Sequence, residues 1–140
     1  MALKDVFCFT YDRMRKYEGS WHVERKPMFP DYVFLESEDG ERLARELKQY
    51  QKILTVLDGD TLTPVHREEE QFLRGLCDGT HHSGMSRGYI QDGHTHITEG
   101  PLRGKERLIR KIDRHKRLAR LEMPGNLRDV NVGLEIYSKV

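Results

Sequence analysis

The second half of this chain holds nine lysine or arginine residues within eighteen positions, between Arg103 and Arg120. Only Glu106 and Asp113 oppose them in that stretch. Cations at this density favour a polyanionic partner, because lysine and arginine neutralise phosphates and release the counterions around a nucleic acid. The predicted nucleic-acid-binding residues are Arg103, Lys105, Arg110, Lys111, Arg114, His115, Lys116, Arg117 and Arg120.

A second interpretation of these cations is structural. Lysine and arginine on alternating exposed strand positions keep a protein soluble and protect sheet edges. The run from Arg114 to Arg117, packed into one turn, favours phosphate contact instead. Sequence-specific RNA binding commonly adds aromatic side chains that stack on bases. This half contains only Tyr89 and Tyr137, so specificity would have to come from RNA shape and arginine geometry.

The first half contains an aromatic segment, residues 28–35, which we predict to be a strand. Successive strand side chains point to opposite faces. Tyr32 and Phe34 would therefore share one face, and Val33 and Leu35 the other. One pair would fill the core and the other would form a contact surface, and the sequence leaves both assignments open.

Neither a metal site nor a catalytic site is predicted. Four of the seven histidines, His81, His82, His94 and His96, lie near one another in sequence, but no cysteine cluster or carboxylate pair completes a tetrahedral set. A charge that changes near pH 6.5 is the alternative role for them. The chain has no catalytic Ser/His/Asp context, no HExxH motif and no glycine-rich phosphate loop, so we expect neither enzyme activity nor a cofactor.

Composition bounds the class of protein. The chain has 140 residues, of which 36% are hydrophobic and 34% charged, as in a globular protein. No apolar run approaches the roughly 20 residues that span a bilayer, and the start lacks the apolar core of a signal peptide. We therefore predict a cytoplasmic protein without a membrane partner. Cys8 and Cys77 lie far apart without CxxC spacing, and we expect both to be reduced.

Charge divides the chain into two parts. Residues 1–80 carry 12 Lys/Arg and 16 Asp/Glu, a net charge of −4, whereas residues 81–140 carry 12 and 7, a net charge of +5. Such an asymmetry predicts separate modules with separate partners.

The elements expected around these segments differ between the two parts. The first half predicts an α+β arrangement: a strand over 6–10, a loop or wide hairpin over 11–24, the strand over 28–35, an amphipathic helix over 41–51, a strand over 53–57 and a helix that starts at Thr63-Pro64. After an aperiodic segment at 77–84, short strands at 94–98, 107–112, 117–123 and 128–132 predict a small barrel.

Two blocks of the sequence resemble the NusG family of transcription elongation factors, and within it the antitermination paralogues of the LoaP type. Residues 21–35, which include Arg25-Lys26 and Phe29-Pro30-Asp31-Tyr32-Val33-Phe34, are similar to the family's Arg-Lys-x-Phe-Pro-Gly-Tyr-Val-Phe-Val strand. Gly100-Pro101-Leu102-Arg103-Gly104 with residues 109–121 resembles the KOW motif. Thr63-Pro64 before an acidic helix resembles the end of the family's N-terminal domain.

The resemblance implies a two-domain fold and two kinds of partner. An α+β NusG-type N-terminal domain would occupy residues 1–78, a linker residues 79–88, and an SH3-like KOW barrel residues 89–140. The N-terminal domain would bind the clamp helices of RNA polymerase, and the KOW domain nascent RNA or another factor such as a ribosomal protein or a termination factor. The polymerase-binding candidates are Phe29, Pro30, Tyr32 and Phe34.

Three departures from the family pattern change these expectations. The chain begins at the family's second strand, which predicts an N-terminal domain without the opening strand and first helix. Arg107 stands where the KOW motif usually has a second glycine, and a positive φ there would strain it. Asp31 replaces the family's glycine in the aromatic segment.

The function implied is transcription elongation or antitermination by a polymerase-tethered, RNA-binding factor. The alternative is a ribosome- or RNA-associated KOW protein that does not act on polymerase. A nucleic-acid-processing enzyme with an appended barrel is a further rival.

Overall fold

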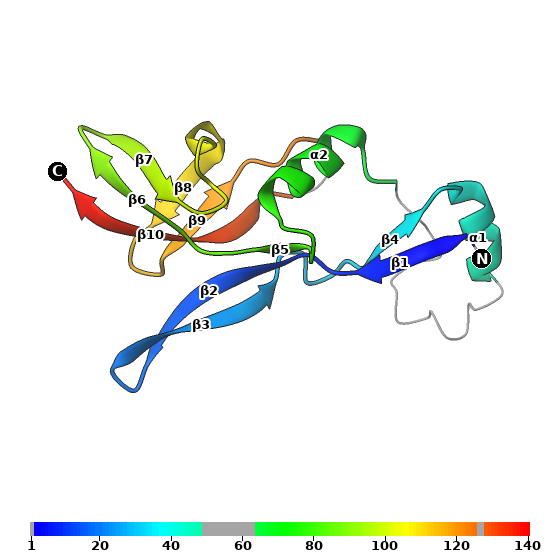
Figure 1. Ribbon diagram of the computed structural model, residues 1–140, viewed down its shortest axis with the longest axis horizontal. Helices are drawn as coiled ribbons and strands as arrows, with labels where there is room; N and C mark the ends of the chain where they lie inside the picture. The colour runs from blue at the N-terminus through cyan, green and yellow to red at the C-terminus, as the bar shows by residue number, and fades with distance from the viewer. Residues whose placement is uncertain (1, 49–63, 126–127) are drawn as a thin grey trace.

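The computed structural model describes residues 2–48, 64–125 and 128–140 of the chain (Figure 1). Within these ranges the chain forms two α-helices and three β-sheets, an α+β fold with a β-rich C-terminal part. This confirms the predicted fold class at that level. The predicted strand over 53–57, the residues 49–51 of the first predicted helix and Thr63 lie outside the described residues.

A long hairpin extends away from the rest of the molecule (Figure 1). Strands β2 (Thr10–Tyr17) and β3 (Ser20–Pro27) pair antiparallel along their whole length. Glu18 and Gly19 connect them with φ angles of 52° and 79°. Two left-handed residues form the tight turn that matches strand twist. Of the loop and the wide hairpin predicted over 11–24, the structure has a hairpin, with a two-residue turn.

The aromatic segment is not the strand that its apolar composition predicts. Residues 28–33 form turns and irregular backbone, and strand β4 covers only Phe34–Ser37, paired with β1 (Leu3–Phe7). Met28 and Phe29 are both buried, at 5% and 2% exposure, within this irregular segment. The Tyr32 N–H donates to the Phe29 carbonyl at 3.1 Å and closes a turn. The strand prediction for residues 28–35 is therefore wrong for most of its length.

Both predicted helices are present among the described residues. Helix α1 covers Gly40–Lys48, and helix α2 covers Arg67–Leu76. The second helix starts three residues after Pro64, so the prediction that this proline lies in its first turn is wrong. The Glu69 carboxylate accepts a hydrogen bond from the His66 N–H at 2.9 Å, which satisfies one amide at the helix start.

The C-terminal part is a five-stranded sheet with the order β7-β6-β10-β9-β8. Its strands are β6 (Ser86–Gln91), β7 (His94–Glu99), β8 (Ile109–Asp113), β9 (Leu118–Leu121) and β10 (Val130–Lys139), and the short 3-10 helix η1 (Glu106–Leu108) precedes β8. The four predicted strands are found here, although the last one runs on to Lys139.

Residues 79–88, predicted as a linker, contain regular structure. Strand β5 (His82–Ser83) pairs parallel with β2, and β6 begins at Ser86. Ser83 and Ser86 are 1% and 0% exposed. Residues 82–83 and 86–88 therefore belong to the sheets, whereas Gly79 and Thr80 at the start of the segment are exposed.

The hairpin and the five-stranded sheet pack closely at Gly133 in the middle of β10. A Cβ on this residue would lie 2.4 Å from the Asp12 carbonyl oxygen of β2 and 2.1 Å from the Met85 sulfur. Only glycine permits that approach. A single cluster of buried apolar side chains joins the N-terminal segments, α2 and the sheet; Phe9, Phe29, Leu73, Leu121 and Leu134 belong to it.

Candidate nucleic-acid interface

The β8–β9 hairpin carries the centre of the basic segment, and its turn is held by a carboxylate. The Lys116 N–H donates to Asp113 Oδ1 at 2.9 Å. This backbone hydrogen bond and the nearby Lys116 charge hold the pKa of Asp113 below its usual value, despite some loss of hydration. The turn ends at Arg117, which has a left-handed φ of 56°. Asp113 thereby supports a turn that also contains the cationic side chains of Arg114, Lys116 and Arg117.

Two cations lie directly opposite each other on this hairpin. Lys111 of β8 and Arg120 of β9 are register partners, and both are exposed. Directly opposed side chains share a face of the sheet, and like charges in that position are destabilising. No carboxylate in the described part of the chain lies within ion-pair distance of either side chain. A bound anion would relieve this repulsion.

The turn adds further positive charge at the end of the same hairpin. Arg114, His115 and Lys116 are all exposed. The turn covers residues 114–117, so it begins three residues after Lys111 and ends three residues before Arg120. Strand rise is about 3.3 Å per residue, which places the turn roughly 10 Å from the Lys111–Arg120 pair along the strands. Among described residues, neither Arg114 nor Lys116 has an ion-pair partner. We call Lys111, Arg114, His115, Lys116 and Arg120 the basic surface.

Two other predicted contact residues have partners within the protein. Arg110 lies 3.2 Å from Glu122, an exposed pair of the kind that contributes little to stability. The Arg117 guanidinium lies 3.9 Å from the centre of the Trp21 ring and 3.5 Å from Glu135. Arg117 therefore attaches the β2–β3 hairpin to the sheet, and its side chain is not available at the basic surface.

Arg103 lies in a separate turn, which is held in place by its buried neighbour Leu102. Leu102 is fully buried, and its N–H donates to the Ser86 hydroxyl at 3.0 Å. Gly100 has a φ of 98°, and a Cβ there would lie 2.5 Å from the Met85 carbonyl oxygen. These constraints explain the Gly-Pro-Leu-Arg-Gly pattern locally and leave Arg103 exposed. Arg107 has no positive φ and lies in η1, so the predicted strain at this position is wrong.

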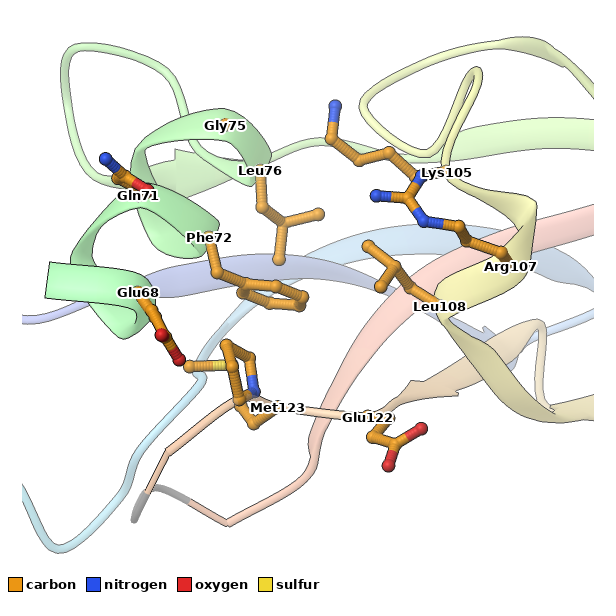
Figure 2. A pocket seen from close by; sticks show the side chains of 11 residues that line it. Glu68, Gln71, Phe72, Gly75, Leu76, Lys105, Arg107, Leu108, Glu122 and Met123 are labelled. Carbon is orange, nitrogen blue, oxygen red and sulfur yellow. The ribbon is translucent and has the colours of Figure 1, made fainter. Parts of the chain in front are cut away.

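A groove separates α2 from η1 and the end of β9 (Figure 2). Its volume is about 540 Å³. Lys105 and Arg107 lie on one wall and α2 supplies the other, with Phe72, Leu108 and Met123 between them. Arg107 belongs to the basic segment but was not among the predicted contact residues. The spacing of Glu68, Phe72 and Gly75 on one helix face was the only sequence signal for the opposite wall.

The residues predicted to bind polymerase divide into buried and exposed pairs. Phe29 and Phe34 are 2% and 8% exposed and belong to the core. Tyr32 is 45% exposed, and Pro30 is also exposed. The Tyr32 ring contacts both buried rings, at centroid distances of 6.0 and 6.4 Å. The structure therefore offers Pro30 and Tyr32 at the surface, supported from within by two phenylalanines.

Two of the histidines, His81 and His82, have structural partners. His82 is buried, with Nε2 2.8 Å from Asp12 Oδ1 and Nδ1 2.7 Å from the Thr10 hydroxyl. The His81 ring stacks on Phe7 with 3.7 Å between centroids. These contacts attach the segment after α2 to β1 and β2. Within residues 2–48, 64–125 and 128–140, no group of three or more His, Cys, Asp or Glu side chains is placed to hold a metal ion.

The two cysteines are free and chemically different. Cys8 is exposed, whereas burial, with the nearby Asp78 charge, raises the pKa of the Cys77 thiol to about 12. Cys77 is therefore protonated at neutral pH and is a poor nucleophile. In the described part of the chain, no helix combines the length and apolarity needed to cross a membrane.

Comparison with known proteins adds no assignment to this geometry: no protein-family model and no curated protein matches the chain.

Proposed function

We propose that this protein is a transcription elongation or antitermination factor of the NusG type that binds RNA through its basic surface. In this proposal residues 89–140 are an SH3-like KOW domain, and the preceding part is the polymerase-binding domain. The resemblance of residues 21–35 and 100–121 to the family's two motifs supports the assignment.

The observation that carries the RNA-binding part is the Lys111–Arg120 pair. Two cations held opposite each other without a described carboxylate partner reduce the stability of the free protein. Edge protection alone does not require this arrangement, since alternating charges of opposite sign would serve it equally well. Phosphates bound at the pair convert an unfavourable contact into a source of affinity.

The exposed pair Pro30 and Tyr32 is the proposed contact with the clamp helices of RNA polymerase. An aromatic ring supported by buried neighbours is a rigid anchor, and such anchors dominate the energetics of protein interfaces. Phe29 and Phe34 hold the Tyr32 ring from the core and do not themselves reach a partner. A factor that works in this way acts in the cytoplasm, where it meets polymerase and nascent RNA.

Co-purification with core RNA polymerase tests the proposal. The wild-type protein should be retained with polymerase, Tyr32→Ala should be lost, and a variant at the exposed Tyr17 of the hairpin, Tyr17→Ala, should be retained. Equal retention of Tyr32→Ala and wild type would contradict the assignment of this contact.

The alternative is a ribosome- or RNA-associated protein that does not act on polymerase. This alternative also explains the unpaired cations, but it assigns no function to the exposed Tyr32. RNA binding that depends on Lys111 and Arg120, without any retention by polymerase, would favour this alternative.

A further inference from the structure

The groove between α2 and η1 has chemically distinct walls (Figure 2). Lys105 and Arg107 lie side by side on the η1 wall. Among the residues described, neither side chain has a carboxylate within ion-pair distance, and the only hydrogen bond of the Lys105 amine goes to the Pro101 carbonyl at 3.5 Å. This wall therefore offers two cations to an anionic group in the groove.

The centre of the groove is apolar and contains an aromatic ring. Phe72 of α2 lies opposite Leu108, with Met123 beneath them (Figure 2). No described aromatic ring packs against Phe72. Its exposed part is consequently open to a flat ligand, which would gain stacking and apolar burial there.

The wall formed by α2 supplies polar side chains, and at Gly75 it lies close to the opposite wall. Glu68 and Gln71 line it and offer carboxylate and amide groups. Gly75 of α2 lies close to Lys105: a Cβ on it would be 3.8 Å from the lysine Cε. The second carboxylate of the groove, Glu122, is already paired with Arg110.

We propose that this groove binds one unpaired nucleotide of the RNA, with its base against Phe72 and its phosphate at Lys105 and Arg107. The inference rests on the proposed RNA binding and adds the site at which a base is recognised. A purely apolar ligand would leave two cations unsatisfied, and an inorganic anion would leave the apolar centre open to water. A nucleotide satisfies both walls, and a volume of about 540 Å³ accommodates it.

An unpaired base is the part of a folded RNA that a protein can read most directly, because bases inside an A-form helix are inaccessible. The basic surface can hold the phosphates of a stem, while the groove selects an RNA with a bulged or looped residue. Arg107, which replaces the glycine usual in the KOW motif, gives the groove one of its two cations.

Two RNA hairpins test the proposal, one with a single bulged adenosine and one with an abasic residue at the same position. Fluorescence anisotropy at one fixed salt concentration gives both affinities. The wild-type protein should bind the adenosine hairpin roughly tenfold more tightly, since stacking of one base contributes on that scale. Equal affinities for the two hairpins would overturn the inference and leave the proposed RNA binding intact. If the wild-type protein binds neither hairpin, the result would contradict the proposed function itself.

Variants separate the two walls of the groove. Phe72→Leu should bring the ratio of the two affinities close to one. Arg107→Gln should weaken binding to both hairpins and preserve the ratio. Arg74→Gln, on α2 but outside the groove and paired with Glu70, should change neither. An unchanged ratio in Phe72→Leu would contradict the placement of the base.

A titration of the wild-type protein tests the site without relying on the correct folding of any variant. Adenosine 5′-monophosphate added to labelled protein should shift the amide resonances of Gly75, Leu108 and neighbouring groove residues. Shifts confined to other parts of the molecule would overturn the site. Groove shifts produced by an acetylated Leu-Leu-Asp-Glu peptide, and not by the nucleotide, would identify a protein ligand and equally overturn it.

Discussion

The two ends of the five-stranded sheet carry arginine on exposed positions, but in different electrostatic surroundings. At the β8–β9 end, Arg120 lies opposite Lys111 without a described carboxylate. At the β6–β7 end, Arg87 lies 3.2 Å from Glu135 and 3.9 Å from Glu99, with its guanidinium 5.0 Å from the centre of the Tyr137 ring. Partners within the protein therefore distinguish a structural cation from one available to a ligand.

Aromatic side chains show the same contrast. Tyr89 stacks on His96 with 4.8 Å between centroids and lies 6.1 Å from Tyr137. These rings resemble a platform for bases, but Arg87, the cation beside Tyr137, is already paired with Glu99 and Glu135. The ring of Phe72 lies instead beside two cations, in the groove. Glu68 and Glu122 also line that groove, but Glu122 is paired with Arg110, so two cations and one carboxylate remain for a ligand.

Charge reversal at the cross-strand pair should have the largest effect. Lys111→Glu combined with Arg120→Glu should reduce RNA affinity about tenfold or more at moderate salt, because phosphate contacts are lost and replaced by repulsion. Anisotropy with a labelled RNA hairpin measures this loss. Circular dichroism spectra that match those of the wild type would show that the fold is retained. Unaltered affinity would remove the distinction between the two ends of the sheet.

Gly133→Ala should disrupt the packing of the β2–β3 hairpin against β10, the central strand of the five-stranded sheet. The added methyl group collides with the Asp12 carbonyl and the Met85 sulfur. Overpacking of this kind destabilises by roughly 1–3 kcal/mol. Urea unfolding measures the free energy of unfolding. Gly19→Ala is unsuitable as a control, because the positive φ of Gly19 would itself strain an alanine. Gly40→Ala, in open space at the start of α1, is the matched control. Equal stability of Gly133→Ala and wild type would contradict the close approach of β2 to β10.

Trp21→Leu tests the structural role of Arg117. The substitution keeps an apolar side chain and removes the cation–π contact, which contributes about 0.5–2 kcal/mol. Thermal unfolding should show a lower Tm, whereas RNA affinity should not fall, because Arg117 is not part of the basic surface. A fall in RNA affinity without any loss of stability would instead indicate that Arg117 or Trp21 contacts RNA.

The smallest effect is a pH dependence of the β8–β9 turn. The folded-state pKa of Asp113 is lowered, chiefly by the hydrogen bond from the Lys116 N–H. Its stabilisation is therefore fully present above the unfolded-state value of about 3.9, and is lost as the pH falls through the lowered folded-state pKa. Asp113→Asn should have a lower Tm than wild type near neutral pH, and the difference should shrink in acid. A difference that is constant with pH would exclude the carboxylate charge as its cause.

Local patterns were sufficient to predict much of the fold. Acidic residues before an apolar face predicted α2, and turns between short apolar runs predicted β7 to β9. The sequence does not predict strand β6, because its two buried residues, Ser86 and Gly88, carry no apolar signal. Residues 28–33 were misread because a compact turn that buries Met28 and Phe29 has the same composition as a strand.

The candidate site was predictable in composition but not in pairing. Arg114, Lys116 and Arg120 are exposed as a basic hairpin implies. The partners of Arg117 are distant in sequence, since Trp21 comes from the other half of the chain. Likewise, Arg107 reaches the groove only because η1 packs opposite α2. Contacts of this kind depend on tertiary packing, which no local pattern encodes.

The salt dependence of RNA binding tests the central claim most directly, with Arg120→Gln compared against Arg87→Gln. For each phosphate contact removed, the slope of log K against log salt should become shallower by about 0.7–0.9. Arg120→Gln should show this change, whereas Arg87→Gln should keep the wild-type slope. Equal slopes in all three proteins, or a change in Arg87→Gln alone, would contradict the assignment of the basic surface as the phosphate-binding site.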